Sequence, residues 1–561
     1  MEVLVRARPA KRRTRMQPAV ARLWQTGKRL AGTYRAMTTR ARTYTAAIDA
    51  LNSLQSNAAT IEAIRRSGKT VNEFNEPEMT EYLERIGHQR KELDKIQVIH
   101  ISGTKGKGST AAFCDALLRQ VDSPPGSKVG LYTSPHMVAA RERIRINGAP
   151  ISEEEFAKYF WEVWDALEQN PDRKLETTPL RPVYFRFMTI LAFHVFISMQ
   201  VSVTLLEVGI GGLYDSTNIV QHPCVAGVTP LGLDHTAILG HTIEEIAYQK
   251  AGIFKRGASA LTTEQPSGAL QVLEKYASDI GASSFRVVPV KDELQGQLLG
   301  LPGDHQSVNA SLALELVRAF LQSPAGQQHF PNGTAQLRKP FAPVTDAARQ
   351  ALKDAFWPGR CQKVPAVNTA GANYYLDGAH TVESVRLSVK WFVREVARHT
   401  QPKILAFNCT NGRSAMSLLG AMKNELEQAG VDPRTFFDQV YFCTNNTYAD
   451  GGSASDLKSL SIDPADLENM SVQRELLDAW CVLQEVAPSS DNPSTAHLSP
   501  QVSAHVVPSI EHVIRAVRQR NSDTGIPADV FVAGSLHLVG GFMAHLQAQG
   551  QLDERLRSIR T

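Results

Sequence analysis

The sequence has few cysteines, and none of them is paired at the spacing typical of a metal site. Its six cysteines stand far apart in 561 residues and form no C-x-x-C pair. This argues against a disulfide framework and a structural zinc site, and it indicates a reducing compartment. Glycine and proline are not abundant, at 38 and 29 residues, and 43% of the residues are hydrophobic. Collagen-like repeats and disorder throughout the chain are therefore excluded.

Long hydrophobic runs are also absent. The most apolar stretch, residues 185–208, is interrupted by Arg186, His194 and Gln200. It never reaches the roughly 18 uninterrupted apolar residues that a membrane-spanning helix needs. We therefore expect a buried helix leading into a strand at residues 201–208, in a chain that is not an integral membrane protein.

Basic residues are in excess only at the amino terminus. Residues 1–43 hold twelve Lys and Arg and one acid, Glu2. The rest of the chain has 48 basic and 55 acidic side chains, a net charge of −7. Because a nucleic-acid partner requires a basic surface, we expect no such partner.

An Arg-rich amino terminus with almost no acids is typical of a mitochondrial transit peptide, and a disordered basic tail is the alternative. Met37 follows most of the positive charge, so translation from Met37 would give a chain without this segment. We therefore predict a transit segment over residues 1–43 and two locations for the protein, the mitochondrion and the cytoplasm.

Short β-rich runs alternate with helical patterns in two series. The first begins at residues 97–102, and its strands recur up to residues 224–229. The second begins near residue 373 and ends with a strand at residues 530–533. Alternation of this kind predicts an α/β fold with mostly parallel sheets.

A stretch rich in Pro, Gly and Gln, residues 322–356, separates the two series. It predicts a hinge, with one domain at residues 44–345 and a second at residues 355–561. Residues 486–503 are rich in Ser and Pro and predict a surface insertion in the second domain.

The strongest motif is the glycine-rich run from Gly103 to Thr110, which follows a predicted strand and precedes a predicted helix. Glycines allow backbone N–H groups to surround phosphate oxygens, and a helix amino terminus adds positive potential. Lys107 can reach the β- and γ-phosphates, and Ser109 can approach the metal-bound phosphates. Nucleotide binding is favoured over a purely structural turn.

Two further motifs follow predicted strands of the first series. Glu207 ends an apolar strand, where a carboxylate is costly unless it is paired or binds a cation. Ligands of α/β sheets gather at the carboxyl ends of strands, so Glu207 is a candidate Mg²⁺ ligand and a salt-bridge partner is the alternative. Asp234 and His235 lie at another strand exit, where they are candidates for a metal ligand, a proton carrier or structural hydrogen bonding.

Two motifs belong to the second series. Arg360, in the WPGRC motif just after the hinge, is suited to stabilising charge on a phosphoryl group. Asp377 and His380 lie at the tip of a strand in the LDGAH motif. Each motif could instead be a surface loop with incidental charge.

Together these motifs resemble the folylpolyglutamate synthases, a family of ATP-dependent ligases in the Mur ligase superfamily. The matching blocks lie in order from about residue 97 to residue 383, and GSLHLVG at residues 534–540 extends the match; they are HISGTKGKGST, YTSPHMVAARERIRING, LLEVGIGGLYDSTN, LGLDHTAILGHTIEEIAYQKAGIFK, LPGDHQSVNA, WPGRCQ and LDGAH. RERIRING and EVGIGGLYDSTN resemble the eukaryotic form of the family.

The resemblance implies a P-loop-type ATPase domain with a mostly parallel sheet, then a smaller Rossmann-like α/β domain, with catalysis in the cleft between them. It implies Mg²⁺ as cofactor and ATP as co-substrate. Carried over by position, the ATP-binding residues would be Gly106, Lys107, Gly108, Ser109, Asn309, Arg360 and Asp377, and the metal ligands Ser134, Glu207 and His235. The catalytic residues would be Lys107, His235 and Lys250, and His380 and Ser535 would hold the incoming glutamate. Lys250 matches the lysine that becomes a carbamate in relatives.

The activity that this resemblance implies is the ATP-dependent addition of L-glutamate to the γ-carboxyl of tetrahydrofolyl-(poly)glutamate through an acyl phosphate, which serves folate retention and one-carbon metabolism. Its partners would be small molecules, namely ATP, reduced folate and L-glutamate, and the chain would act as a monomer. Dihydrofolate synthase, which adds the first glutamate to dihydropteroate, is the nearest alternative.

Two other classes of function are less favoured by the residues. A regulatory module that only binds nucleotide need not keep the full set of Lys107, Glu207, His235, Lys250 and Arg360. A nucleic-acid-dependent ATPase does not fit the acidic charge of the chain after residue 43.

Overall fold

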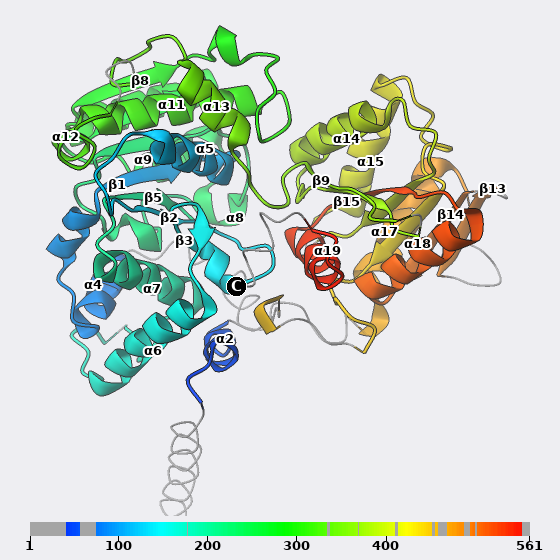
Figure 1. Ribbon diagram of the computed structural model, residues 1–561, viewed down its shortest axis with the longest axis horizontal. Coiled ribbons are helices and arrows are strands. Elements are labelled where there is room, and N and C mark those ends of the chain that lie inside the picture. The colour runs from blue at the N-terminus through cyan, green and yellow to red at the C-terminus, as the bar shows by residue number, and fades with distance from the viewer. Residues whose placement is uncertain are drawn as a thin grey trace, which may run out of the picture.

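The computed structural model describes residues 41–55, 75–176, 178–333, 337–368, 370–409, 413–450, 455–457, 468–486, 494–499 and 502–552. Within these residues the chain forms two sheets, each with helices on both faces (Figure 1). This confirms the predicted α/β fold class. The predicted transit segment, residues 1–43, lies outside the described residues except for its last three.

The first sheet has eight strands in the order β4-β3-β2-β5-β1-β6-β7-β8. Six of them are parallel, and β3 and β4 form an antiparallel edge beside β2. The four central strands are buried along their whole length, as expected for a parallel sheet covered on both faces. The strands are β1 (Val98–Ser102), β2 (Val129–Tyr132), β3 (Ile144–Ile146), β4 (Ala149–Pro150), β5 (Val203–Glu207), β6 (Val225–Val228), β7 (Ser259–Thr263) and β8 (Ser284–Val288).

The helices of the first sheet fall into two layers. The core on one face includes α5 (Lys107–Gln120), α11 (Gln306–Gln322) and α13 (Asp346–Asp354). The opposite core includes α2 (Tyr44–Asn52), α4 (Asn75–Arg85), α6 (Glu153–Gln169) and α7 (Tyr184–Ser198). The other helices are α8 (Thr236–Leu239), α9 (Ile243–Ala251), α10 (Ser267–Ile280) and α12 (Pro324–His329).

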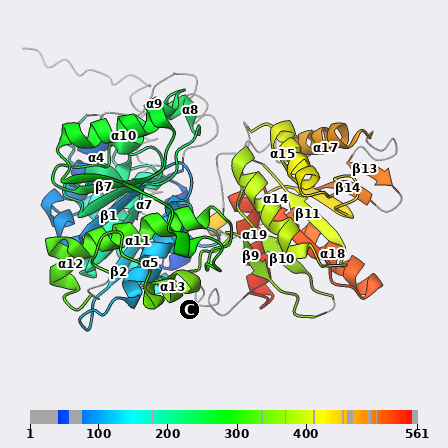
Figure 2. The same cartoon turned by 90° about the horizontal axis from the view of Figure 1, so that it is seen from above.

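The second sheet has the strand order β13-β14-β12-β11-β15-β10-β9, with five parallel strands between two antiparallel edges. Helices α14, α15 and α17 cover one face, and α18 and α19 cover the other (Figure 2). The strands are β9 (Gln362–Val364), β10 (Asn373–Leu376), β11 (Lys403–Phe407), β12 (Gln439–Cys443), β13 (Thr495–Ser499), β14 (Val502–Val507) and β15 (Asp529–Ala533). The helices are α14 (Val382–Val396), α15 (Ala415–Gln428), α17 (Ser471–Gln484), α18 (Ile510–Thr524) and α19 (Leu536–Ala548).

The stretch at residues 486–503 is not only the surface insertion that its composition predicts. Its last part enters the sheet, because β13 pairs with β14 and β14 pairs in parallel with β12. Alternate residues of β14 are buried, which is the pattern of a strand near the edge of a sheet. Residues 487–493 lie outside the described residues.

The apolar stretch at residues 185–208 folds as expected. It forms α7, whose apolar side chains pack in the core, and then β5. No helix among the described residues is both long and apolar enough to cross a membrane.

The linker between the two sheets is anchored on both sides. Phe356 packs against the core of the second sheet, and the next residue, Trp357, packs against the core of the first. Met137, in the loop after β2, is buried in the core of the second sheet, so this loop also bridges the two parts.

Helix α13 lies between the predicted domains, residues 44–345 and 355–561, and packs against α5. The predicted domain limits stay predictions.

Candidate active site

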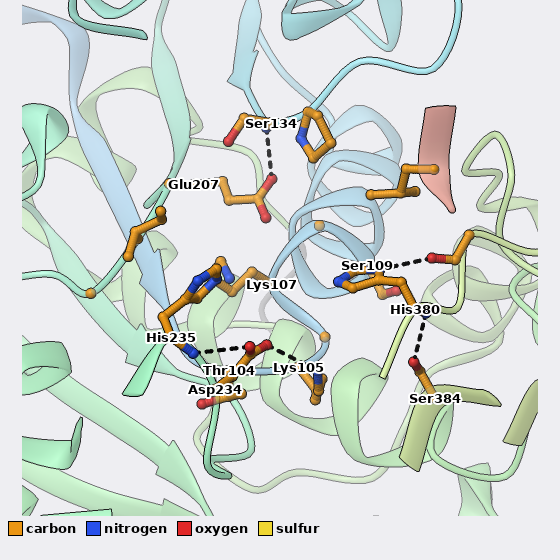
Figure 3. A pocket seen from close by; sticks show the side chains of 18 of the residues that line it. Thr104, Lys105, Lys107, Ser109, Ser134, Glu207, Asp234, His235, His380 and Ser384 are labelled. Carbon is orange, nitrogen blue, oxygen red and sulfur yellow. Dashed lines mark hydrogen bonds and ion pairs between the residues drawn. The ribbon is translucent and has the colours of Figure 1, made fainter. Parts of the chain in front are cut away.

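A cavity of about 730 Å³ lies between the two sheets. Its walls follow the carboxyl ends of β1, β2, β5 and β6 in the first sheet and of β10 and β15 in the second, where ligands of parallel sheets bind. Ten of the predicted site residues line it, and Figure 3 labels six of them. The ten are Gly106, Lys107, Gly108, Ser109, Ser134, Glu207, His235, Arg360, Asp377 and His380.

The glycine-rich loop between β1 and α5 is tightly packed. Gly103 and Gly106 both have positive φ angles, +145° and +85°. A Cβ atom at Gly103 would lie 1.8 Å from Thr229 Oγ1, and one at Gly106 would lie 2.2 Å from Asn309 Oδ1. Only glycine therefore fits at these positions, and the loop can turn directly into α5, which begins at Lys107. Its N–H groups then lie at a helix amino terminus, as a phosphate site requires.

Lys107 lies over this loop. Its Nζ donates to the Gly103 carbonyl oxygen at 3.1 Å. Burial lowers the pKa of Lys107, an effect that the nearby Glu207 carboxylate opposes. The neighbouring Ser109 is buried and accepts a hydrogen bond from Gln306 Nε2 at 3.4 Å. A phosphate bound in this loop would give the Lys107 ammonium a negatively charged partner.

Glu207 ends β5 and is 4% exposed. Its Oε2 accepts a hydrogen bond from the backbone N–H of Ser134 at 3.2 Å, as Figure 3 shows. Burial raises the pKa of Glu207, and the charge of Lys107 acts in the opposite direction. Oε1 makes no hydrogen bond to the residues that the structure describes, so this oxygen is free to bind a cation in the cavity.

Asp234 and His235 follow β6. The Asp234 carboxylate pairs with Lys105 Nζ at 3.2 Å and accepts the backbone N–H of His235 at 3.0 Å. Although burial acts to raise the pKa of Asp234, Lys105 and His235 together lower it to about 2. Burial lowers the pKa of His235, so its imidazole is neutral at physiological pH, the state that can bind a metal.

Some of these residues suit the predicted Mg²⁺ site. Among the described residues, no three His, Cys, Asp or Glu side chains gather in a way that would hold an ion by themselves. Glu207 still offers one carboxylate oxygen to the cavity, beside the phosphate loop. Mg²⁺ at a nucleotide site usually takes one or two protein carboxylates and fills its remaining positions with phosphate oxygens and water. The oxygen donors present therefore suit a nucleotide-bound Mg²⁺.

Lys250 does not line the cavity. It is 3% exposed on α9, behind the phosphate loop, and its Nζ donates to the same Gly103 carbonyl oxygen as Lys107, at 2.9 Å. Burial lowers the pKa of Lys250 well below its ordinary value, and the charge of Lys107 adds to this effect. Because the two amines share one carbonyl oxygen, the positive charge of Lys107 favours the neutral form of Lys250.

The second sheet contributes Arg360, Asp377 and His380. The Asp377 carboxylate accepts the backbone N–H groups of Cys361 at 2.8 Å and of Ala379 at 2.9 Å, so it joins the two loops that carry Arg360 and His380. His380 Nδ1 lies 2.9 Å from the Gly378 carbonyl oxygen. Because a carbonyl only accepts, Nδ1 carries the proton and Nε2 is left as an acceptor. Burial lowers the pKa of His380 to about 4.

Two more predicted residues, like Lys250, do not form part of the cavity wall. Asn309 on α11 supports Gly106 from behind and donates to Gln306 Oε1 at 2.9 Å. Ser535 is 1% exposed and accepts the Leu538 N–H at 3.3 Å, so it caps the amino terminus of α19. This hydrogen bond gives Ser535 a structural role in the absence of substrate.

Sequence reasoning missed two residues that line the cavity. Asp215 holds the loop after β5, because its carboxylate accepts the N–H groups of Gly209 and Ile210, both at 3.1 Å. Arg143 is buried at the cavity wall beside Tyr184. Both belong to the matching blocks, LLEVGIGGLYDSTN and YTSPHMVAARERIRING, which was the available signal.

Comparison with known proteins decides the family. The chain is 39% identical to a folylpolyglutamate synthase of Neurospora crassa over 523 residues, which cover 92% of this chain and 93% of that protein. It is 41% identical to a folylpolyglutamate synthase of Saccharomyces cerevisiae over 511 residues, which cover 90% of this chain and 86% of that protein. The chain belongs to the folylpolyglutamate synthase family. No protein-family model matches the sequence.

Solved structures of the family share the fold. The folylpolyglutamate synthase of Mycobacterium tuberculosis, solved with ADP and AMPPCP, has a TM-score of 0.60 and 21% sequence identity. The match covers 84% of this chain and 95% of that one. The two-sheet architecture of this chain is thus that of the folylpolyglutamate synthases, and the resemblance seen in the sequence is confirmed.

The packing of Gly106 against Asn309 gives the first prediction. Gly106→Ala should raise the Kd for ATP by at least about tenfold, since it displaces a loop whose N–H groups would each contribute about 1.5–3 kcal/mol to a charged phosphate. Gly126→Ala is the control, because Gly126 has the similar φ of +88° but no atom within 4 Å of an added Cβ. Equilibrium binding of ATP measures both, and an equal Kd in the two variants would contradict the assignment of the loop.

Proposed function

We propose that this chain is a folylpolyglutamate synthase, an ATP-dependent ligase that adds L-glutamate to the γ-carboxyl of a folate glutamyl tail and releases ADP and phosphate. One observation carries the proposal beyond family membership. One and the same cavity is lined by the phosphate loop of the first sheet and by Arg360 and His380 of the second. Nucleotide and acceptor can therefore meet between cationic groups from both sheets.

The chemistry explains why such an arrangement is needed. A carboxylate is a poor acyl donor, because the leaving group in an attack on its carbon would be an oxide ion. Phosphorylation gives an acyl phosphate, whose carbonyl carbon the glutamate amine can attack while phosphate leaves. The first step brings an anionic carboxylate to an anionic γ-phosphate, so Lys107 and Arg360 must offset the repulsion where it develops. The remaining task of the protein is to align three reactants.

Ser134, Glu207 and His235 would hold Mg²⁺ in this proposal. When bound, the ion would supply positive charge to the phosphate oxygens. The support is the Glu207 carboxylate, whose Oε1 has no protein partner among the described residues and whose Oε2 is already fixed by the Ser134 N–H. His235 contributes a neutral imidazole at the same cavity. In this proposal one chain completes the site and acts as a monomer.

Dihydrofolate synthase is the alternative, and an assay separates the two. Purified protein is incubated with ATP, Mg²⁺, radiolabelled glutamate and either tetrahydrofolate or dihydropteroate, with Lys107→Ala as the inactive control. Label transferred to tetrahydrofolate supports the proposal. Label transferred only to dihydropteroate would overturn it in favour of the alternative.

The role of Glu207 gives the second prediction. Glu207→Gln removes the negative charge but keeps the side-chain size, so kcat should fall by on the order of 100-fold and the Mg²⁺ concentration for half-maximal rate should rise. Glu264→Gln is the matched control, because Glu264 also follows a parallel strand, β7, but is exposed and outside the cavity wall. An unchanged Mg²⁺ dependence in Glu207→Gln would count against the assignment.

Lys250 gives the third prediction. We propose that its neutral amine reacts with CO₂ and releases a proton to form a carbamate, which would place a carboxylate behind the phosphate loop. The support is the depressed pKa of the buried amine, since only the neutral form is nucleophilic. Lys250→Ala should lose activity and recover part of it when acetate is added. Wild-type turnover of this variant without acetate would contradict the proposal.

The location of the protein is a further proposal, supported by the Arg-rich composition of residues 1–43 and by Met37. Residues 1–45 fused to a fluorescent reporter should carry it to mitochondria, and the same fusion started at Met37 should stay in the cytosol. A diffuse cytosolic signal from the longer fusion would reject the transit segment.

A further inference from the structure

Arg143 is a buried cation with no acidic partner among the residues that the structure describes. It is 9% exposed, it lines the cavity, and its guanidinium lies 5.4 Å from the ring centre of Tyr184. Its guanidinium makes one hydrogen bond within the described part of the chain, from Nε to His136 Nδ1 at 3.0 Å. No carboxylate among the described residues lies within ion-pair distance of it. Because burying an unpaired charge is costly, the guanidinium is built for an anion that enters from outside the chain.

The neighbouring carboxylates are already engaged. Glu142, the preceding residue, accepts the backbone N–H groups of Met137, Val138 and Ala139 at 2.7–3.0 Å. Glu207 accepts the N–H of Ser134, and Lys107 acts on its pKa more strongly than Arg143 does. Neither acid is therefore the counter-ion of Arg143, and its terminal nitrogens make no hydrogen bond to the described residues.

The direction of Arg143 is set from the second sheet. His136 Nδ1 accepts from Arg143, so Nε2 carries the imidazole proton and donates it to the Asp456 carbonyl oxygen at 3.0 Å. Asp456 belongs to the short helix η5 (Ser455–Leu457), between β12 and α17. Its Oδ1 also accepts the Tyr44 hydroxyl at 2.5 Å and the Ala140 N–H at 2.7 Å. A residue more than 300 positions away thus fixes the loop that carries Arg143.

The surroundings of Arg143 indicate which anion it binds. The triphosphate has its own partners in the phosphate loop, Lys107 and Arg360. Arg143 instead lies beside Tyr184, and the next residue, Phe185, lines the same cavity. Aromatic side chains next to a cation suit an acceptor that carries both an aromatic ring and a carboxylate. A folate with its glutamyl tail has this chemistry, whereas free glutamate has no ring.

We infer that Arg143 binds a carboxylate of the folate glutamyl tail, and that His136 and Asp456 act as positioning residues that hold the guanidinium toward the cavity. The inference rests on the proposed function and names a binding group for its acceptor.

The test is the KM for each substrate. Arg143→Met keeps much of the side-chain volume and removes the charge, so the KM for tetrahydrofolate should rise by about 10- to 100-fold, the cost of losing hydrogen bonds to a charged group. The KM values for ATP and glutamate should change less than about twofold, since Arg143 binds neither. Thermal unfolding and ATP binding show whether the variant is folded. A rise in KM for ATP or glutamate alone, or no change in any KM, would overturn the inference.

A second pair of variants tests the positioning role. His136→Leu breaks the connection while Arg143 remains, so the KM for tetrahydrofolate should rise. His136→Gln keeps one N–H donor and one oxygen acceptor and should restore the wild-type KM. An unchanged KM in the Leu variant, or the same rise in both, would overturn the role of His136. If wild-type protein fails to ligate glutamate to any folate, the proposed function fails; if it ligates normally and Arg143→Met does too, only this inference fails.

Discussion

The proposed reaction brings two anions together, and the arrangement of the site follows from their mutual repulsion. A carboxylate must approach a triphosphate in one cavity of about 730 Å³, and the protein answers with cationic groups that are buried or partly buried. Lys107, Arg143 and Arg360 face this space, and Lys250 lies behind the phosphate loop, where its amine shares the Gly103 carbonyl oxygen with Lys107. Burial lowers the pKa of both lysines, so keeping either of them charged without substrate costs free energy.

The fold supplies these charges because two parallel sheets end at one place. In each sheet the functional loops lie at the carboxyl ends of the parallel strands, so loops distant in sequence meet without long connections. Close contacts then hold these loops in place. Gly103 packs against Thr229 and Gly106 against Asn309, and the Asp377 carboxylate hydrogen-bonds to two loops of the second sheet. The loop after β2 joins both parts, since Met137 packs in the core of the second sheet while Ser134 holds Glu207.

Much of this could be predicted from the sequence, for a physical reason. Buried parallel strands and glycine-rich turns leave local patterns, so the central strands, the phosphate loop and Glu207 were found where the structure has them. Tertiary packing leaves no such local pattern in the sequence. Lys250 and Ser535 are predicted at the site, but Lys250 lies behind the phosphate loop and Ser535 caps the amino terminus of a helix. The composition of residues 486–503 predicts a surface insertion, but part of it is the edge strand β13. The hydrogen bonds from Arg143 to His136 and from His136 to Asp456 connect residues more than 300 positions apart. Local sequence patterns carry no signal of such a connection.

If the carboxylate attacks the γ-phosphate before glutamate is joined, one carboxylate oxygen must be transferred to the released phosphate, and this transfer can be measured. Folate substrate labelled with ¹⁸O in its terminal γ-carboxyl is turned over with ATP and L-glutamate, and the phosphate released is examined by mass spectrometry. The carboxylate oxygen that attacks the γ-phosphorus becomes the bridging oxygen of the acyl phosphate, so one labelled oxygen should leave with each phosphate. Phosphate free of label after complete turnover would contradict it.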